Sequence, residues 1–317
     1  RIHSGSSLAA HRAPQLFASS VHRMDAASMP PAAEVPRRLY EHGFEGWDVS
    51  QACYVTDYLI MAVGIACSLV AYEKVRSTST WATMWTLMGQ FAVFSLLQGV
   101  GSGFRGVTHH LLDTYREEGY VMGKRWGAPH SEWLFAWLMA LIILPLASAS
   151  CLGTSLAYGE FAAGWIKLVK ALGVVVAIFE VFLCLSNRID ESGAISVYWG
   201  VLVSSIACFV VFRRGFSVAG LCLIFSGNVL RVAGYIILMI VPPGCKHVGM
   251  HRFNCPYPEE FNHNAIYHLF IAASVLAIYF GVDAKFTKAK EIAYWEELRR
   301  NEEKSPKEKD RRCTLAW

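Results

Sequence analysis

Several histidines and carboxylates lie near the ends of apolar segments of this chain, where they are placed to hold a metal ion. His109, His110 and Asp113 follow the second apolar segment, and His268 lies at the start of the last one. Imidazoles and carboxylates that converge in a partly dry site bind Zn²⁺ through three protein ligands, and the fourth position holds a water activated to attack an amide or ester carbonyl. We predict zinc ligands at His109, His110 and His268. Asp113 is then a catalytic base or a group that orients a ligand.

The same residues have a second interpretation. Histidines are stable at a membrane interface, where they form hydrogen bonds with loops, and the sequence contains no compact H-E-x-x-H motif. Spacing still groups some of them, because His109 and Asp113 are four residues apart and so are Asn264 and His268. Asp57, at the start of the first apolar segment, belongs to the same end of a seven-helix bundle. Both interpretations remain open from the sequence.

A second polar set lies deep inside apolar segments. Glu180 and Arg231 are about equally far from the starts of the fourth and sixth segments, so we predict that they lie at one depth and pair. Asn228 shares the Arg231 face, which gives a candidate polar pocket, and His263 and Asn264 are further candidates for such a pocket. Intramembrane charges usually mark a functional site. The alternative is a buried pair that only fixes helix packing.

The elements that must position these residues are membrane-spanning helices. Hydrophobic side chains make up 54% of the 317 residues and charged ones only 17%, so the apolar surface exceeds what a water-soluble fold can bury. About 20 mostly apolar residues are needed per span. The sequence predicts an all-α, polytopic seven-transmembrane-helix bundle, with spans at Tyr54–Tyr72, Trp81–Phe104, Trp133–Leu152, Ile166–Ser186, Ile195–Phe212, Phe216–Val241 and Asn264–Val282.

Charge and composition divide the chain into three parts. Residues 1–50 form a partly disordered amino-terminal tail, 51–284 the transmembrane domain, and 285–317 a charged helix and tail. Residues 1–23 have the composition of a transit peptide, or of a disordered tail. We expect a helix over Lys288–Lys304 and disorder beyond it. Cys245 and Cys255 share one polar loop, where they form a disulfide if that loop faces an oxidising compartment.

Lysine and arginine near the helix ends predict the orientation. Their small excess on the side of the carboxyl-terminal tail places that tail in the cytoplasm and the amino terminus outside or in a lumen, in a membrane that the sequence does not identify. The expected partner is the lipid bilayer. The mild net charge of +4 lies largely in the tails, which argues against nucleic-acid binding.

The histidine pattern resembles the seven-helix superfamily of alkaline ceramidases and progestin/adiponectin receptors. There, a Ser-x-x-x-His pattern on helix two and a His-x-x-x-His on the last helix bind zinc. The resemblance implies that His109 or His110 is the helix-two ligand and that His268 is a ligand on helix seven. This sequence departs from the pattern at Asn264, which replaces the first histidine of helix seven, and at Arg105 and Gly106, which replace the serine.

The run Asn264-Ala-Ile-Tyr-His268 is also similar to a poorly characterised group of seven-helix membrane proteins, which implies no activity.

Two functional hypotheses follow. The first hypothesis is a zinc-dependent intramembrane hydrolase that acts on a lipid amide or ester. The alternative is a receptor, sensor or small-solute carrier without enzymatic activity, with a polar pocket at Glu180 and Arg231.

Overall fold

The computed structural model describes residues 50–76, 86–117, 132–186, 189–213, 219–239, 261 and 263–314. These ranges form seven α-helices, and each is long and apolar enough to cross a membrane. The predicted all-α seven-helix bundle is confirmed. The helices are α2 (Gln51–Arg76), α3 (Leu87–Glu117), α4 (Glu132–Tyr158), α5 (Ala163–Leu185), α6 (Ile189–Phe212), α7 (Ala219–Met239) and α8 (His263–Thr314).

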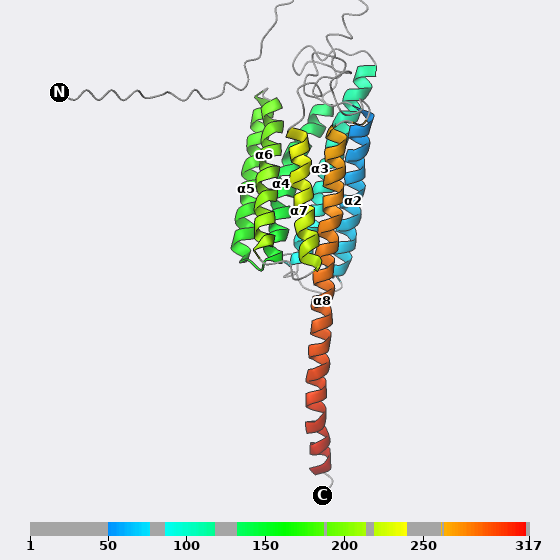
Figure 1. Ribbon diagram of the computed structural model, residues 1–317, viewed down its shortest axis with the longest axis vertical. Helices are drawn as coiled ribbons and strands as arrows, with labels where there is room; N and C mark the ends of the chain where they lie inside the picture. The colour runs from blue at the N-terminus through cyan, green and yellow to red at the C-terminus, as the bar shows by residue number, and fades with distance from the viewer. Residues whose placement is uncertain are drawn as a thin grey trace, which may run out of the picture.

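The helices stand side by side and alternate in direction along the chain (Figure 1). Helix α2 packs against α3 and α8, α7 packs against α6 and α8, and α4 packs against α3, α5 and α6. The start of α2, the end of α3 and the start of α8 therefore meet at one end of the bundle, where the sequence predicts a group of polar residues. We call this group, with Asp57, His109 and His268, the polar rim. A helix satisfies most of its backbone polar groups internally, which is what a lipid environment requires.

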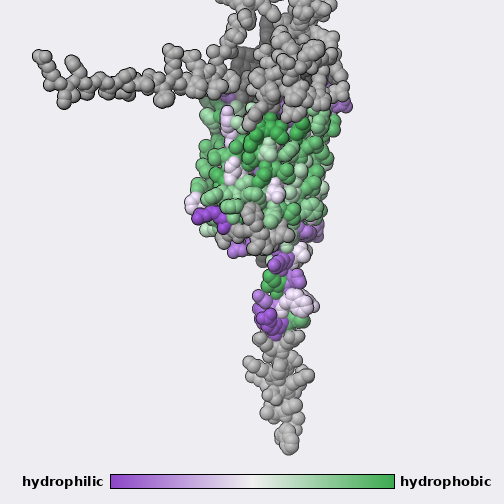
Figure 2. Space-filling view, viewed as in Figure 1, coloured by the Kyte–Doolittle hydropathy of each residue, from purple (hydrophilic) through white to green (hydrophobic). Residues whose placement is uncertain are grey.

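An apolar belt covers the face of the bundle seen in Figure 2, and the hydrophilic residues of the described part on that face lie mainly beyond it. Helix α5 shows how the belt arises, because Val175, Ile178 and Phe182 point outward and are 61%, 65% and 62% exposed. Large apolar side chains with such exposure are stable in contact with lipid tails, whereas in water they would form an aggregation-prone patch.

Close contact between α2 and α3 depends on two glycines. A Cβ on Gly64 would lie 2.6 Å from the Ser95 carbonyl oxygen and 2.7 Å from the Gly99 Cα. Small residues allow such close approach between membrane helices. The contact brings the first turns of α2 near the last turns of α3, which is where the polar rim forms.

Two helices are longer than the apolar pattern predicts. Helix α3 continues beyond Phe104 to Glu117, so His109 and His110 lie on the helix itself. Helix α8 continues without a break to Thr314, which corrects the prediction that order ends near Lys304. Residues 1–49 and the candidate disulfide between Cys245 and Cys255 lie outside the described residues.

Candidate metal centre

Asp57 is the centre of the polar rim and is completely buried on α2. Arg105 of α3 donates to its Oδ1 atom from Nε at 2.9 Å and from Nη2 at 2.6 Å. A buried carboxylate is stable only when it is paired and hydrogen-bonded, and Arg105 supplies both the charge and the donors. Arg105 also lies over the Tyr267 ring, 5.5 Å from its centroid, which ties this ion pair to α8.

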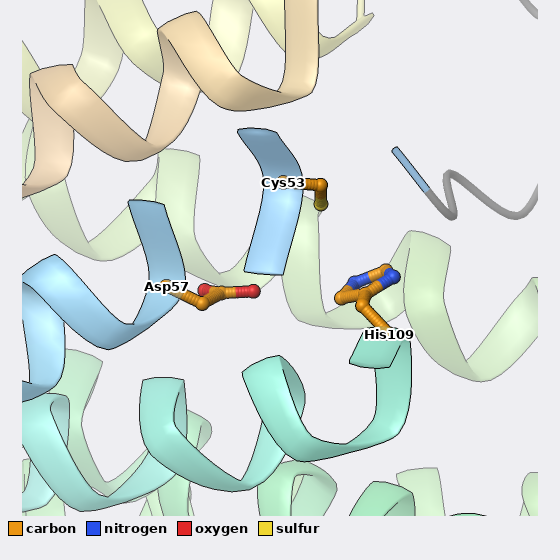
Figure 3. A group of neighbouring side chains, drawn as sticks. All are labelled: Cys53, Asp57 and His109. Atoms are coloured by element: carbon orange, nitrogen blue, oxygen red, sulfur yellow. The ribbon is translucent and has the colours of Figure 1, made fainter. Parts of the chain in front are cut away.

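Cys53, Asp57 and His109 form a group that could hold a metal ion. Each offers one ligand atom, and these atoms lie within 4.8 Å of one another with all three residues buried. Cys53 and Asp57 lie one helical turn apart on α2, and His109 approaches from α3 (Figure 3). Thiolate sulfur, imidazole nitrogen and carboxylate oxygen are the donor types that zinc accepts, and three ligands suit a catalytic site.

His268 of α8 is completely buried beside this group. Its Nδ1 atom lies 3.1 Å from the Cys53 carbonyl oxygen and 2.9 Å from the Thr56 hydroxyl. A carbonyl oxygen only accepts, so the contact with Cys53 favours the tautomer with the proton on Nδ1, which leaves a lone pair on Nε2. Nε2 has no hydrogen-bond partner and faces the Asp57 Oδ1 atom at 3.5 Å. Arg105 donates to the same carboxylate oxygen, so His268 and Arg105 both lie beside Asp57 Oδ1.

The other predicted site residues have different positions. His110, adjacent to His109, is exposed and stacks on the Tyr54 ring with centroids 4.7 Å apart, so it is not part of the metal group. Asp113 is half-buried one turn further along α3 and is also outside that group. His263 is half-buried at the first position of α8. Asn264 donates from Nδ2 to the Cys53 sulfur at 3.1 Å and thereby supports a candidate ligand.

The predicted pairing of Glu180 with Arg231 is wrong. Glu180 accepts a hydrogen bond from the Ser196 hydroxyl of α6 at 2.8 Å, whereas Arg231 donates to Gln98 of α3 at 3.1 Å. Equal depth did not bring the two side chains together because they point to different neighbours. Asn228 donates to Ser155 of α4 at 3.4 Å. The polar residues of α5 and α7 therefore do not form one shared pocket.

Cys53 is the candidate ligand that the sequence did not predict. It is a small residue in an otherwise unremarkable helical turn, and no metal-binding spacing marks it. One signal was present, since Cys53 and Asp57 are four residues apart and must share one helix face.

The described fold and the apolar belt define the class of this chain, which is an integral multi-pass membrane protein. Comparisons with protein-family models, curated proteins and solved structures found no match.

Proposed function

We propose that this chain is a metal-dependent membrane hydrolase that holds Zn²⁺ at Cys53, Asp57 and His109 and cleaves an amide or ester bond of a lipid. The observation that carries the proposal is the convergence of three buried donor atoms within 4.8 Å of one another. His268 lies beside this group, with its Nε2 atom 3.5 Å from the Asp57 Oδ1 atom.

The formal charges of the site suit a divalent ion. Asp57 and a Cys53 thiolate carry two negative charges, and Arg105 carries one positive charge. A divalent cation leaves one positive charge, which a hydroxide would cancel. Neutrality matters here, because an uncompensated buried charge is costly in a bilayer.

The chain's own residues have distinct roles in this proposal. Cys53, Asp57 and His109 hold the ion, which when bound supplies a water with a lowered pKa. Arg105 keeps Asp57 ionised and oriented through its two hydrogen bonds. His268 has its neutral tautomer fixed by the Cys53 carbonyl, so its Nε2 atom is available to accept a proton from a water at the site. Asp113 is not required as the base.

The depth of the site supports a lipid substrate. Asp57 lies six residues inside α2, which corresponds to about 9 Å along the helix. A site near the end of a spanning helix lies closer to the headgroups, where the amide and ester bonds of membrane lipids lie, than to the middle of the bilayer. The basic residues near the helix ends support an orientation with this rim outside or in a lumen and the end of α8 in the cytoplasm.

The proposal is tested with the purified chain in liposomes that contain a synthetic amide lipid and a synthetic ester lipid. Release of free acid is measured by mass spectrometry, with added zinc and after treatment with a chelator. We expect hydrolysis of at least one lipid, its loss on chelation and its recovery with zinc. His109→Ala should abolish it, because that variant lacks a metal donor.

The matched control is His110→Ala, which removes the adjacent imidazole but leaves the metal group intact. We expect this variant to keep most of the activity. Hydrolysis that survives chelation, or an absence of hydrolysis by zinc-loaded protein, contradicts the proposed function. Equal loss in the two histidine variants contradicts the proposed ligand set.

A further inference from the structure

Arg231 is a completely buried cation for which the described part of the chain supplies no acidic partner. Its Nη1 atom donates to the Gln98 amide oxygen at 3.1 Å, and its Nη2 atom makes a long contact of 3.5 Å with the Tyr235 hydroxyl. Its Nε atom is buried and has no hydrogen-bond partner. The guanidinium lies over the Phe94 ring, 5.3 Å from the centroid. Both hydrogen-bond partners are neutral, so the positive charge is not compensated.

Arg105 shows, in the same chain, how such a group is normally satisfied. It directs Nε and Nη2 at the Asp57 carboxylate, which is the side-on edge that arginine commonly offers to an acid. Arg231 uses Nη1 for Gln98 and keeps the corresponding edge, Nε with Nη2, without an acid. Within the part of the chain that the structure describes, Arg105 therefore has a carboxylate partner and Arg231 does not.

A second buried donor, the Ser274 hydroxyl of α8, lies within about one helical turn of Arg231. A Cβ on Gly227 of α7 would meet the Ser274 carbonyl oxygen of α8 at 3.0 Å, and one on Gly234 would meet the Tyr267 ring at 3.2 Å. This antiparallel register places Arg231 opposite the turn that ends at Ser274. The Ser274 hydroxyl is buried and has no hydrogen-bond partner. Among the described residues, neither the Arg231 Nε atom nor the Ser274 hydroxyl has an acceptor, and two such donors within about one turn of each other favour an anion as their partner.

We propose that Arg231 is the centre of an anion-binding site that takes a carboxylate, held by its Nε–Nη2 edge with Tyr235 and Ser274 as additional donors. A singly charged carboxylate compensates one guanidinium and matches its two parallel N–H groups. A phosphate dianion would leave one negative charge buried without a partner, which disfavours it.

The site is separate from the candidate metal centre and does not rest on the proposed hydrolysis. Gln98, which contacts Arg231, is seven residues before Arg105 on α3, a separation of about 10 Å along the helix. The carboxylate belongs either to a small water-soluble acid or to an acid with a long apolar chain. The site chemistry is the same for both, so the experiment has to distinguish them.

The experiment measures the thermal unfolding of the purified full chain in detergent, with a chelator present so that metal binding plays no part. Acetate, decanoate and decanol are titrated separately. A ligand that binds only the folded state raises the unfolding temperature as its concentration passes Kd. We expect saturable stabilisation by at least one carboxylate and none by decanol. Stabilisation by acetate indicates a small acid, and stabilisation by decanoate alone indicates an amphiphilic one.

Arg231→Met keeps most of the side-chain volume and removes the charge. We expect it to weaken carboxylate binding by at least about tenfold, the loss of a charge-assisted bidentate contact. Ser274→Ala is the milder variant and should weaken binding several-fold without removing the charge, so it provides the test if Arg231→Met does not fold. Absence of stabilisation of the wild-type chain by both carboxylates overturns the proposal. Equal carboxylate binding by the wild type and the folded variants also overturns it.

Discussion

Arg105 donates two hydrogen bonds to one oxygen atom of Asp57, and this ion pair joins α2 to α3 inside the polar rim. The pair fixes the carboxylate that the candidate metal group needs. The ion pair lies about two turns from the start of α2, next to the candidate metal group. A substitution that breaks the pair should therefore affect both the stability of this end of the bundle and the proposed chemistry.

Arg105→Ala tests that coupling. The substitution leaves the buried Asp57 carboxylate without its cation, and we expect it to lower the free energy of unfolding by about 3–5 kcal/mol. Thermal and denaturant unfolding in detergent measure the change. Arg76→Ala removes the exposed partner of Glu73, which lies 3.6 Å away, and should change stability by less than about 1 kcal/mol. Similar costs for the two variants would contradict a structural role for the Asp57–Arg105 pair.

Cobalt substitution tests Cys53 as a ligand. A thiolate bound to Co²⁺ gives a charge-transfer absorption band in the near ultraviolet, so we expect this band in the cobalt-loaded wild-type chain. Cys53→Ser should abolish it, because serine supplies oxygen in place of sulfur. Cys67→Ser is the matched control, since Cys67 is also buried on α2 but lies outside the metal group. A band that survives in Cys53→Ser would exclude Cys53 as a ligand.

The close approach of α2 and α3 gives a third prediction. Gly64→Ala places a methyl group 2.6 Å from a backbone oxygen, and we expect it to destabilise the bundle by about 1–3 kcal/mol. It should also weaken metal binding, because it moves α2 relative to His109. Gly164→Ala on α5 meets nothing within 4 Å and should be neutral, or stabilising by up to about 1 kcal/mol. Unfolding temperatures of the two variants decide the matter, and a harmless Gly64→Ala would refute the close contact.

The separation of Glu180 from Arg231 is tested by a double-mutant cycle with Glu180→Gln and Arg231→Met. The two residues share no hydrogen-bond partner, so we expect their effects on unfolding to add within about 0.5 kcal/mol. A coupling energy well above that value would restore the pairing that the sequence suggested.

The sequence predicted the class and the rim because both follow from simple counts. The apolar runs give the number of spans. With seven spans that alternate in direction, the first residues of α2 and α8 and the last residues of α3 lie on the same side of the membrane. This reasoning correctly grouped Asp57, His109 and His268, which the structure places at one buried site.

Rotation about the helix axis explains most of what the sequence did not predict. Depth in the membrane follows from residue number, but the direction of a side chain depends on which neighbour its helix packs against. Glu180 faces Ser196 and Arg231 faces Gln98 for this reason. His109 and His110 are the same type of residue at nearly the same depth. Only the fold shows that His109 is buried and His110 is exposed.

The most direct test of the central proposal is the zinc content of the purified wild-type chain and of His109→Ala and His110→Ala, measured by elemental mass spectrometry after loading and desalting. We expect one zinc per chain in the wild type and in His110→Ala, and little or none in His109→Ala. Wild-type protein that folds but retains no zinc, or variants that lose zinc equally, would contradict the metal centre at Cys53, Asp57 and His109.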